Sequence, residues 1–247
     1  MSQREIAGHL EREVSPRSSR PPSMRPEREV RVEDDGAIRD VILDRRSKKN
    51  AITLGMYVAL GDAVSEAAAN DATRVLLVRS SGGAFTIGNE IVTSSGAEAD
   101  PATLEAFSQA EGAFLKTLAA FPKPIVAAVN GLAVGIGAMM LLYCDLVIAS
   151  EFAAFEFSSA RQGTVPHPLS CALLEARIGL QRASEWLLLG ERVKADEVLR
   201  LGLINAIVPL ENLHTSARTR AEALSRLPRR AALETKRLLH EPMRIGR

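Results

Sequence analysis

The sequence predicts an α/β protein, because short apolar runs alternate with segments of helical periodicity along most of its 247 residues. Three runs are almost continuously apolar: RVLLVRSS (74–81), PIVAAV (124–129) and DLVIAS (145–150). Such runs are typical of parallel strands that are buried on both faces. A sheet built from them needs helices on both sides, and the intervening segments have the spacing to supply those helices.

The elements follow one another in a regular order. Residues 1–27 are rich in Ser, Pro and Arg and cannot bury an apolar face, so we expect a disordered N-terminal tail. A hairpin follows from Glu29, with its turn at Asp34-Asp35-Gly36. A helix then begins near Thr53, whose side chain can cap it. Apolar spacing predicts further helices over 102–120, 135–143, 175–189, 195–201, 211–224 and 229–239, and a strand over 203–209. We therefore expect a core over 28–190 and a C-terminal helical segment over 191–247.

Composition excludes several classes of protein. The 31 Lys and Arg residues and 30 Asp and Glu residues give a net charge of +1, which favours neither nucleic acid nor an anionic membrane as a partner. Two cysteines and scattered histidines make neither a disulfide framework nor a metal-binding pattern, so we expect no metal. The chain has no apolar run of about 20 residues and no signal-like start, which predicts a soluble, cytoplasmic protein.

Three segments depart from ordinary α/β patterning: GGAFTIGNEI (82–91), VNGLAVGIGAMMLLYCDLVIAS (129–150) and RQGTVPHPLS (161–170). The first two follow predicted strands, and a glycine turn at such a position leaves backbone N–H groups without partners. Their glycines match neither GxGxxG nor the P-loop. One such segment is explained by close helix–sheet packing, whereas two together favour a site with two N–H donors for a developing oxyanion.

The chain from about residue 29 to 240 resembles the crotonase superfamily, the enoyl-CoA hydratases and isomerases. Four landmarks occur in family order: LDRRSKKNAI (43–52), VLLVRSSGGAFTIGNEI (75–91), PKPIVAAVNGLAVGIGAMMLLYCDLVIAS (122–150) and LGERVKADEVLRLGLINAIVP (189–209). The resemblance implies a crotonase-like spiral of ββα units. It also implies an acyl-CoA thioester substrate, with coenzyme A as part of that substrate rather than a separate cofactor. A homotrimer or hexamer held by the C-terminal helical segment is the implied assembly.

The resemblance also assigns site residues. The oxyanion would be held by the backbone N–H groups of Asn89 and Ile136, a task for which the side chains matter little. Coenzyme A would lie near a basic turn, for which a simple solvated turn is the alternative interpretation. The residues that the resemblance places there are Arg46, Lys48, Lys49 and Ala51.

The two glutamates that hydratases of this family use are missing. Their positions hold Met139, which cannot ionise, and Ser159, which is a poor base without activation. The isomerase branch needs only one base, and its GxxPE segment is matched here by Gly163-Thr164-Val165-Pro166 followed by His167. An imidazole with an ordinary pKa of about 6.5 can carry a proton at neutral pH. A loop histidine held between two prolines is the alternative interpretation.

These observations predict an enzyme that moves the double bond of a 3-enoyl-CoA to give a 2-enoyl-CoA through an enolate. Two alternatives stay open. One is different thioester chemistry at the same oxyanion site, namely hydration, hydrolysis or decarboxylation. The other is a non-catalytic paralogue that keeps the fold and the acyl-CoA site.

Overall fold

A six-stranded sheet forms the centre of the protein, for which a computed structural model describes residues 29–90 and 100–240. Its strand order is β1-β2-β3-β5-β7-β10. The first two strands form the antiparallel hairpin that the sequence predicts, and all other neighbours are parallel. The strands are β1 (Val30–Asp35), β2 (Ile38–Leu43), β3 (Val75–Ser80), β5 (Ile125–Val129), β7 (Leu146–Ser150) and β10 (Ala206–Val208). The α/β class predicted from the alternating runs is therefore confirmed.

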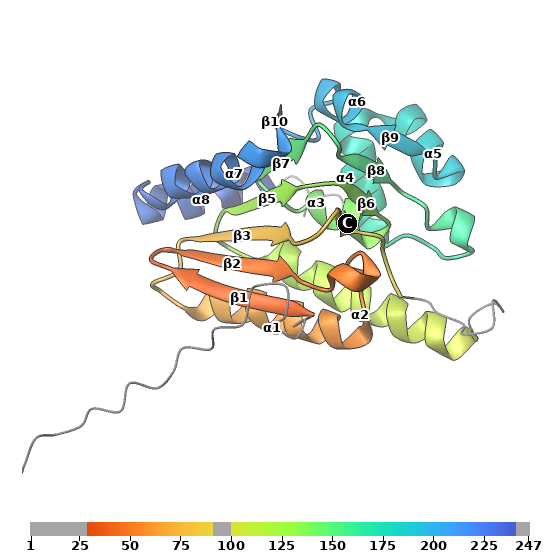
Figure 1. Cartoon of the computed structure of the whole chain (residues 1–247), viewed down its shortest axis with the longest axis horizontal. Coiled ribbons are helices and arrows are strands. Elements are labelled where there is room, and N and C mark those ends of the chain that lie inside the picture. The colour runs from red at the N-terminus through yellow and green to blue at the C-terminus, as the bar shows by residue number, and fades with distance from the viewer. Residues whose placement is uncertain (1–28, 91–99, 241–247) are drawn as a thin grey trace, which may run out of the picture.

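Helices cover both faces of this sheet, as its apolar strands require. Figure 1 shows α1 (Leu54–Ala69) and α2 (Pro101–Ala120) on one side and α7 (Leu210–Ser225) on the other. In β3, Leu76 and Val78 belong to the larger core on the first side, whereas Val75 and Leu77 face α7. The alternation along one strand thus supplies two separate cores.

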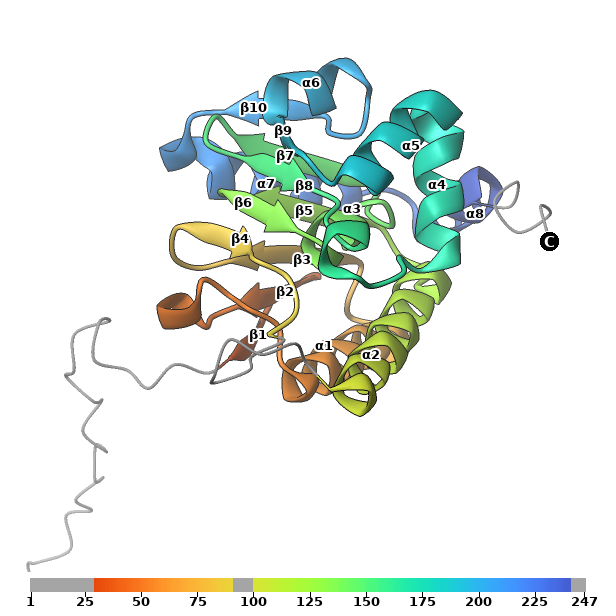
Figure 2. The same cartoon turned by 90° about the vertical axis from the view of Figure 1, so that its right-hand side faces the viewer.

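A second sheet of four very short strands lies beside the first, in the order β4-β6-β8-β9. Figure 2 shows these strands next to the main sheet. They are β4 (Ala84–Thr86), β6 (Leu132–Val134), β8 (Ala154–Glu156) and β9 (Arg192–Lys194). Each of the strands β3, β5 and β7 continues into a short strand of this sheet and then into a helix, which produces a repeated ββα spiral. None of these four strands was predicted from the sequence.

Local signals set the helix boundaries. Thr53 caps α1 by accepting a hydrogen bond from the Met56 N–H, as predicted, and Asp100 caps α2 in the same way. The single helix predicted over 175–189 is wrong. Two helices occupy this region, α4 (Pro168–Ile178) and α5 (Leu180–Leu189), because Gly179 between them has a φ of +79°. Such a conformation ends an α-helix and favours glycine.

The remaining helices are α3 (Ile136–Leu141), α6 (Ala195–Arg200) and α8 (Arg229–His240), with one-turn 3-10 helices at Arg46–Lys48 and Ala160–Gln162. No helix in the described ranges is long and apolar enough to cross a membrane. The tail predicted over 1–27 lies outside the described residues.

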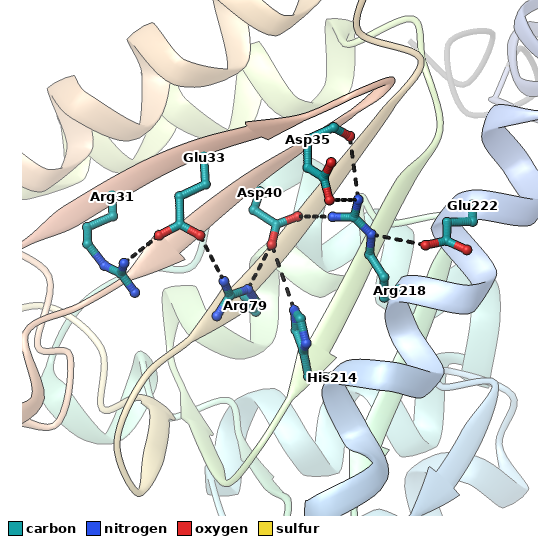
Figure 3. A network of polar contacts seen from close by, with 8 residues as sticks. All are labelled: Arg31, Glu33, Asp35, Asp40, Arg79, His214, Arg218 and Glu222. Atoms are coloured by element: carbon teal, nitrogen blue, oxygen red, sulfur yellow. Dashed lines mark hydrogen bonds and ion pairs between the residues drawn. The ribbon is translucent and has the colours of Figure 1, made fainter. Parts of the chain in front are cut away.

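A polar network joins α7 to the strand hairpin (Figure 3). The buried carboxylate of Asp40 on β2 accepts a hydrogen bond from Arg79 Nε at 3.0 Å. Arg218 on α7 lies 3.5 Å from the same carboxylate and also pairs with Asp35 at 2.5 Å, while His214 Nε2 is 3.8 Å from Asp40. Arg79 from a second strand and Arg218 from a helix thus both lie against this carboxylate, and the Arg218 ion pairs help to hold α7 over the sheet.

Candidate active site

A cavity of about 480 Å³ opens where the ends of β4 and β6 meet α2 and the segment that leads into α4. Residues from all three unusual segments of the sequence line it: 82–91, 129–150 and 161–170. Its lining includes the two predicted oxyanion donors and the predicted proton carrier. It also includes one of the two positions at which the resemblance implies a glutamate, and one glutamate that was not predicted from the sequence. These residues are Asn89, Ile136, Ser159, His167 and Glu111.

The parallel pairing of β4 with β6 brings the two predicted N–H donors to one end of the cavity. Thr86 pairs with Ala133, so the segments that follow β4 and β6 leave this sheet side by side and lead to Asn89 and Ile136. The Ile52 N–H donates to the Gly88 carbonyl, and the Ile52 carbonyl accepts from the Glu90 N–H. In this parallel pairing the N–H of the intervening Asn89 points away from Ile52. Ile136 is the first residue of α3, where an N–H has no partner inside the helix. Neither N–H has a hydrogen-bond acceptor among the described residues.

Glycine is required where these two segments approach one another. A Cβ on Gly137 would lie 2.4 Å from Thr86 Cγ2, which is a steric clash. Gly88 has a φ of +90°, and a Cβ there would lie 3.3 Å from the Val134 carbonyl oxygen. The close packing considered from the sequence is therefore present at both glycine segments, and it fixes the positions of the two N–H groups.

Glu111 on α2 is the titratable residue that the sequence analysis missed. Its carboxylate accepts a hydrogen bond from Asn89 Nδ2 at 3.1 Å and lies 3.5 Å from the Tyr57 hydroxyl. Burial raises the pKa of Glu111 above its ordinary value, although these two contacts partly oppose the shift. Tyr57 donates a hydrogen bond to Asn89 Oδ1 at 2.6 Å. Burial, together with the nearby Glu111 carboxylate, raises the pKa of this phenol well above its ordinary value, so it stays protonated.

A signal for Glu111 is present in the sequence. The buried side chains of α2 are Phe107, Phe114, Leu115 and Leu118, and Glu111 falls at helical spacing within that stripe. A carboxylate on the apolar face of a helix must find hydrogen-bond donors when it is buried. The stripe indicates burial, but it does not identify the donors.

His167 lies in the cavity wall at the N-terminus of α4. Its Nδ1 accepts a hydrogen bond from the Leu169 N–H at 3.3 Å and so caps the helix. The ring packs against α2, because a Cβ on Gly112 would lie 3.5 Å from its Cδ2 and 3.8 Å from its Nε2. The imidazole is thus next to the helix residue that follows Glu111.

Met139 and Ser159, the two positions at which the resemblance implies glutamates, differ in their surroundings. Met139 is fully buried in the core on α3 and does not line the cavity. Ser159 does line it, and its carbonyl accepts the N–H of Thr164 at 2.9 Å, which helps to shape the loop before His167.

The basic turn lies beside this site rather than inside the cavity. Arg46 pairs with Asp44 at 2.9 Å, whereas Lys48 and Lys49 are exposed and form no ion pair within the described part of the chain. Ala51 is buried, and its carbonyl accepts a hydrogen bond from Arg45 at 3.1 Å. Its neighbour Ile52 pairs directly with Asn89, so the turn adjoins the first of the two predicted oxyanion donors.

Arg45 is a second polar residue that the sequence analysis missed. It pairs with Glu90 at 2.8 Å and with Glu29 at 3.0 Å. These contacts connect the basic turn to the residue that follows Asn89. They hold in place the segment that carries Asn89, the first predicted N–H donor.

The family model described as enoyl-CoA hydratase/isomerase matches residues 33–245. The chain belongs to the enoyl-CoA hydratase/isomerase family. It is 32% identical over 215 residues to enoyl-CoA delta isomerase 2 of Rattus norvegicus; the match covers 86% of this chain but only 54% of that protein, about half its length.

Two solved structures place this family member in the crotonase superfamily by fold as well. OdaA of Pseudomonas aeruginosa is 35% identical, with a TM-score of 0.77 and coverage of 86% of this chain and 85% of that one. An enoyl-CoA hydratase of Mycobacterium avium subsp. paratuberculosis is 26% identical, with a TM-score of 0.80 and coverage of 90% and 89%. The crotonase-like fold predicted from the sequence is confirmed. Both isomerases and hydratases occur among these relatives.

Proposed function

We propose that this family member binds acyl-CoA thioesters and converts a 3-enoyl-CoA to a 2-enoyl-CoA. The observation that supports this most directly is a shared cavity lining. Two backbone N–H groups that have no hydrogen-bond acceptor among the described residues line the same cavity as the two ionisable side chains of Glu111 and His167. Double-bond migration needs stabilisation of an enolate oxygen and one route for a proton, and the cavity can supply both.

In this proposal the thioester carbonyl oxygen lies between the N–H groups of Asn89 and Ile136. Removal of a C2 proton places negative charge on that oxygen, and the two donors bind the charge more strongly than they bind the neutral carbonyl. One such donor typically lowers the barrier by about 3–4 kcal/mol. The exposed amines of Lys48 and Lys49 would bind phosphates of coenzyme A, since they adjoin the donor segment through Ile52.

Hydration is less favoured by this arrangement. The two glutamate positions that support hydration hold a buried methionine outside the cavity and a serine. Neither side chain is an effective base for water at neutral pH. The sequence-based prediction that His167 carries the proton is compatible with its place in the cavity wall, and its role is considered further below.

The test is a direct comparison of two reactions with the purified full-length protein. A short-chain 3-enoyl-CoA is followed by the absorbance of the conjugated thioester that it forms, and the corresponding 2-enoyl-CoA is followed by loss of that absorbance. We expect measurable isomerisation and little hydration. Hydration faster than isomerisation would refute the assignment. Acyl-CoA binding without any reaction would favour the non-catalytic paralogue.

A further inference from the structure

We propose that Glu111, rather than His167, is the catalytic residue that carries the proton, and that His167 acts as a hydrogen-bond donor in the same cavity. This inference rests on the proposed isomerase function. It follows from how the two side chains are hydrogen-bonded.

The hydrogen bond to Nδ1 of His167 limits what this ring can do. In a neutral imidazole one nitrogen carries a proton and the other has the free lone pair. Because Nδ1 accepts the Leu169 N–H, its lone pair is in use and the proton lies on Nε2. Nε2 is the ring nitrogen on the side of α2, beside Gly112. The neutral ring therefore presents a donor there, and it has no lone pair at Nε2 with which to remove a proton.

Glu111 has the complementary arrangement. Its carboxylate lines the cavity, and Asn89 Nδ2 donates a hydrogen bond to Oε2. A carboxylate has several acceptor sites, so lone pairs remain after this bond and the contact with Tyr57. Its partial burial weakens the solvation of the charged form, which makes the carboxylate a stronger base than an exposed glutamate.

Asn89 links the base to the oxyanion site. Its backbone N–H is one proposed oxyanion donor, while its side chain accepts from Tyr57 and donates to Glu111. One residue therefore positions the carboxylate next to the carbonyl whose adjacent carbon loses a proton. Tyr57 is a positioning residue, since it fixes the orientation of the Asn89 amide.

The chemical step balances with this chain's own groups. The Glu111 carboxylate takes the proton from C2, and the electron pair of that C–H bond forms the enolate held by the two N–H groups. The enolate then collapses: the carbonyl re-forms, the double bond shifts from C3–C4 to C2–C3, and C4 takes the proton back from the Glu111 carboxylic acid. The carboxylate is regenerated, and no other reactant is consumed.

The test compares Glu111→Gln with Glu105→Gln. Both residues are on α2, and the two variants make the same change in charge, but Glu105 is exposed at the rim and bonds to Gln109. We expect Glu111→Gln to lower kcat for isomerisation by ~10²–10⁴-fold with little change in acyl-CoA affinity. Glu105→Gln should stay within a few-fold of wild type. A Glu111→Gln enzyme whose kcat for isomerisation is also within a few-fold of the wild-type value would overturn the inference.

Two further measurements separate a base from a structural residue. Added formate should restore activity to Glu111→Ala, because it can supply the missing carboxylate, whereas it should not affect Glu105→Ala. The fall in kcat at acidic pH should persist in His167→Ala, since protonation of Glu111 causes it. If the acid limb is absent in His167→Ala while Glu111→Gln retains it, the proton carrier is the histidine.

A separate reaction distinguishes failure of this inference from failure of the proposed function. Exchange of the C2 hydrogens of a saturated acyl-CoA in deuterium oxide needs the base and the oxyanion site but no double bond. Exchange by wild type that is lost in Glu111→Gln supports the inference even if no 3-enoyl-CoA is isomerised. Isomerisation and exchange that both survive Glu111→Gln leave the proposed function standing and overturn the role of Glu111.

Discussion

A buried ion pair joins α8 to the rest of the described structure, and we expect the attachment of this helix to depend on it, which Lys236→Met tests. Lys236 on α8 is 8% exposed, and its Nζ donates to Asp145 Oδ2 at 2.8 Å and to the Lys123 carbonyl at 2.7 Å. It also lies 5.6 Å from the centre of the Phe121 ring. Asp145 additionally accepts the Ile125 N–H and contacts His240 at 3.2 Å. Methionine keeps much of the side-chain volume but leaves the carboxylate without its lysine.

The expected loss follows from this geometry. Breaking a buried pair by removing one partner typically costs about 3–5 kcal/mol. The Asp145 side chain is 19% exposed and keeps the His240 contact, so we expect the lower end, about 3 kcal/mol. For a chain of this length that corresponds to a fall in Tm of roughly 6–12 °C.

The loss should depend on pH. Burial alone would raise the pKa of Asp145, but the hydrogen bonds and charges of His240 and Lys236 outweigh it and hold this pKa below its ordinary value. A carboxylate with a lowered pKa stabilises the fold at neutral pH, and this contribution is lost as the pH falls through the folded-state pKa. The difference between wild type and Lys236→Met should therefore be largest near neutral pH and shrink below about pH 4.

Denaturant unfolding followed by circular dichroism measures the effect. Arg237→Met is the matched control, because this neighbour on α8 is half exposed and pairs with Glu234 on the surface. We expect it to unfold close to wild type. Adding Asp145→Asn to Lys236→Met should recover part of the loss, since no uncompensated charge then remains. A Lys236→Met protein within about 1 kcal/mol of wild type, a third of the expected loss, would refute this reasoning.

Two further predictions concern ligand and assembly. Saturating acyl-CoA should raise the Tm of the wild-type protein by mass action. Gly88→Val should abolish this rise, because Gly88 has a φ of +90° and adjoins the Val134 carbonyl. A folded Gly88→Val protein with a normal rise in Tm would contradict the proposed site. Light scattering should show a trimer or hexamer. Leu189 on α5 and Leu239 on α8 are apolar side chains that the single chain leaves exposed, and contact with another subunit would bury them. A monomer at micromolar concentration would contradict this prediction.

Local sequence patterns were enough to predict the main sheet and most of the helices around it. The runs that became β3, β5 and β7 are apolar on both faces, and only a parallel sheet covered by helices buries such strands. The glycine turns were also evident, because a glycine with positive φ after a strand is a local property of the chain. The interruption at Gly179 was missed, since the apolar spacing continues across it.

The second sheet and the chemistry of the cavity could not be predicted from local sequence patterns, because both depend on how distant segments pack. The strands of the second sheet are three residues long, which is too short for an alternation of apolar and polar residues to distinguish them from loops. Glu111 sits on an apolar helix stripe, but its donors Asn89 and Tyr57 come from positions 22 and 54 residues earlier in the chain. The protonation site of His167 depends on a side-chain rotamer that caps α4. A local pattern can indicate that a polar group is buried, whereas the partners that set its chemistry arrive only when distant segments pack together.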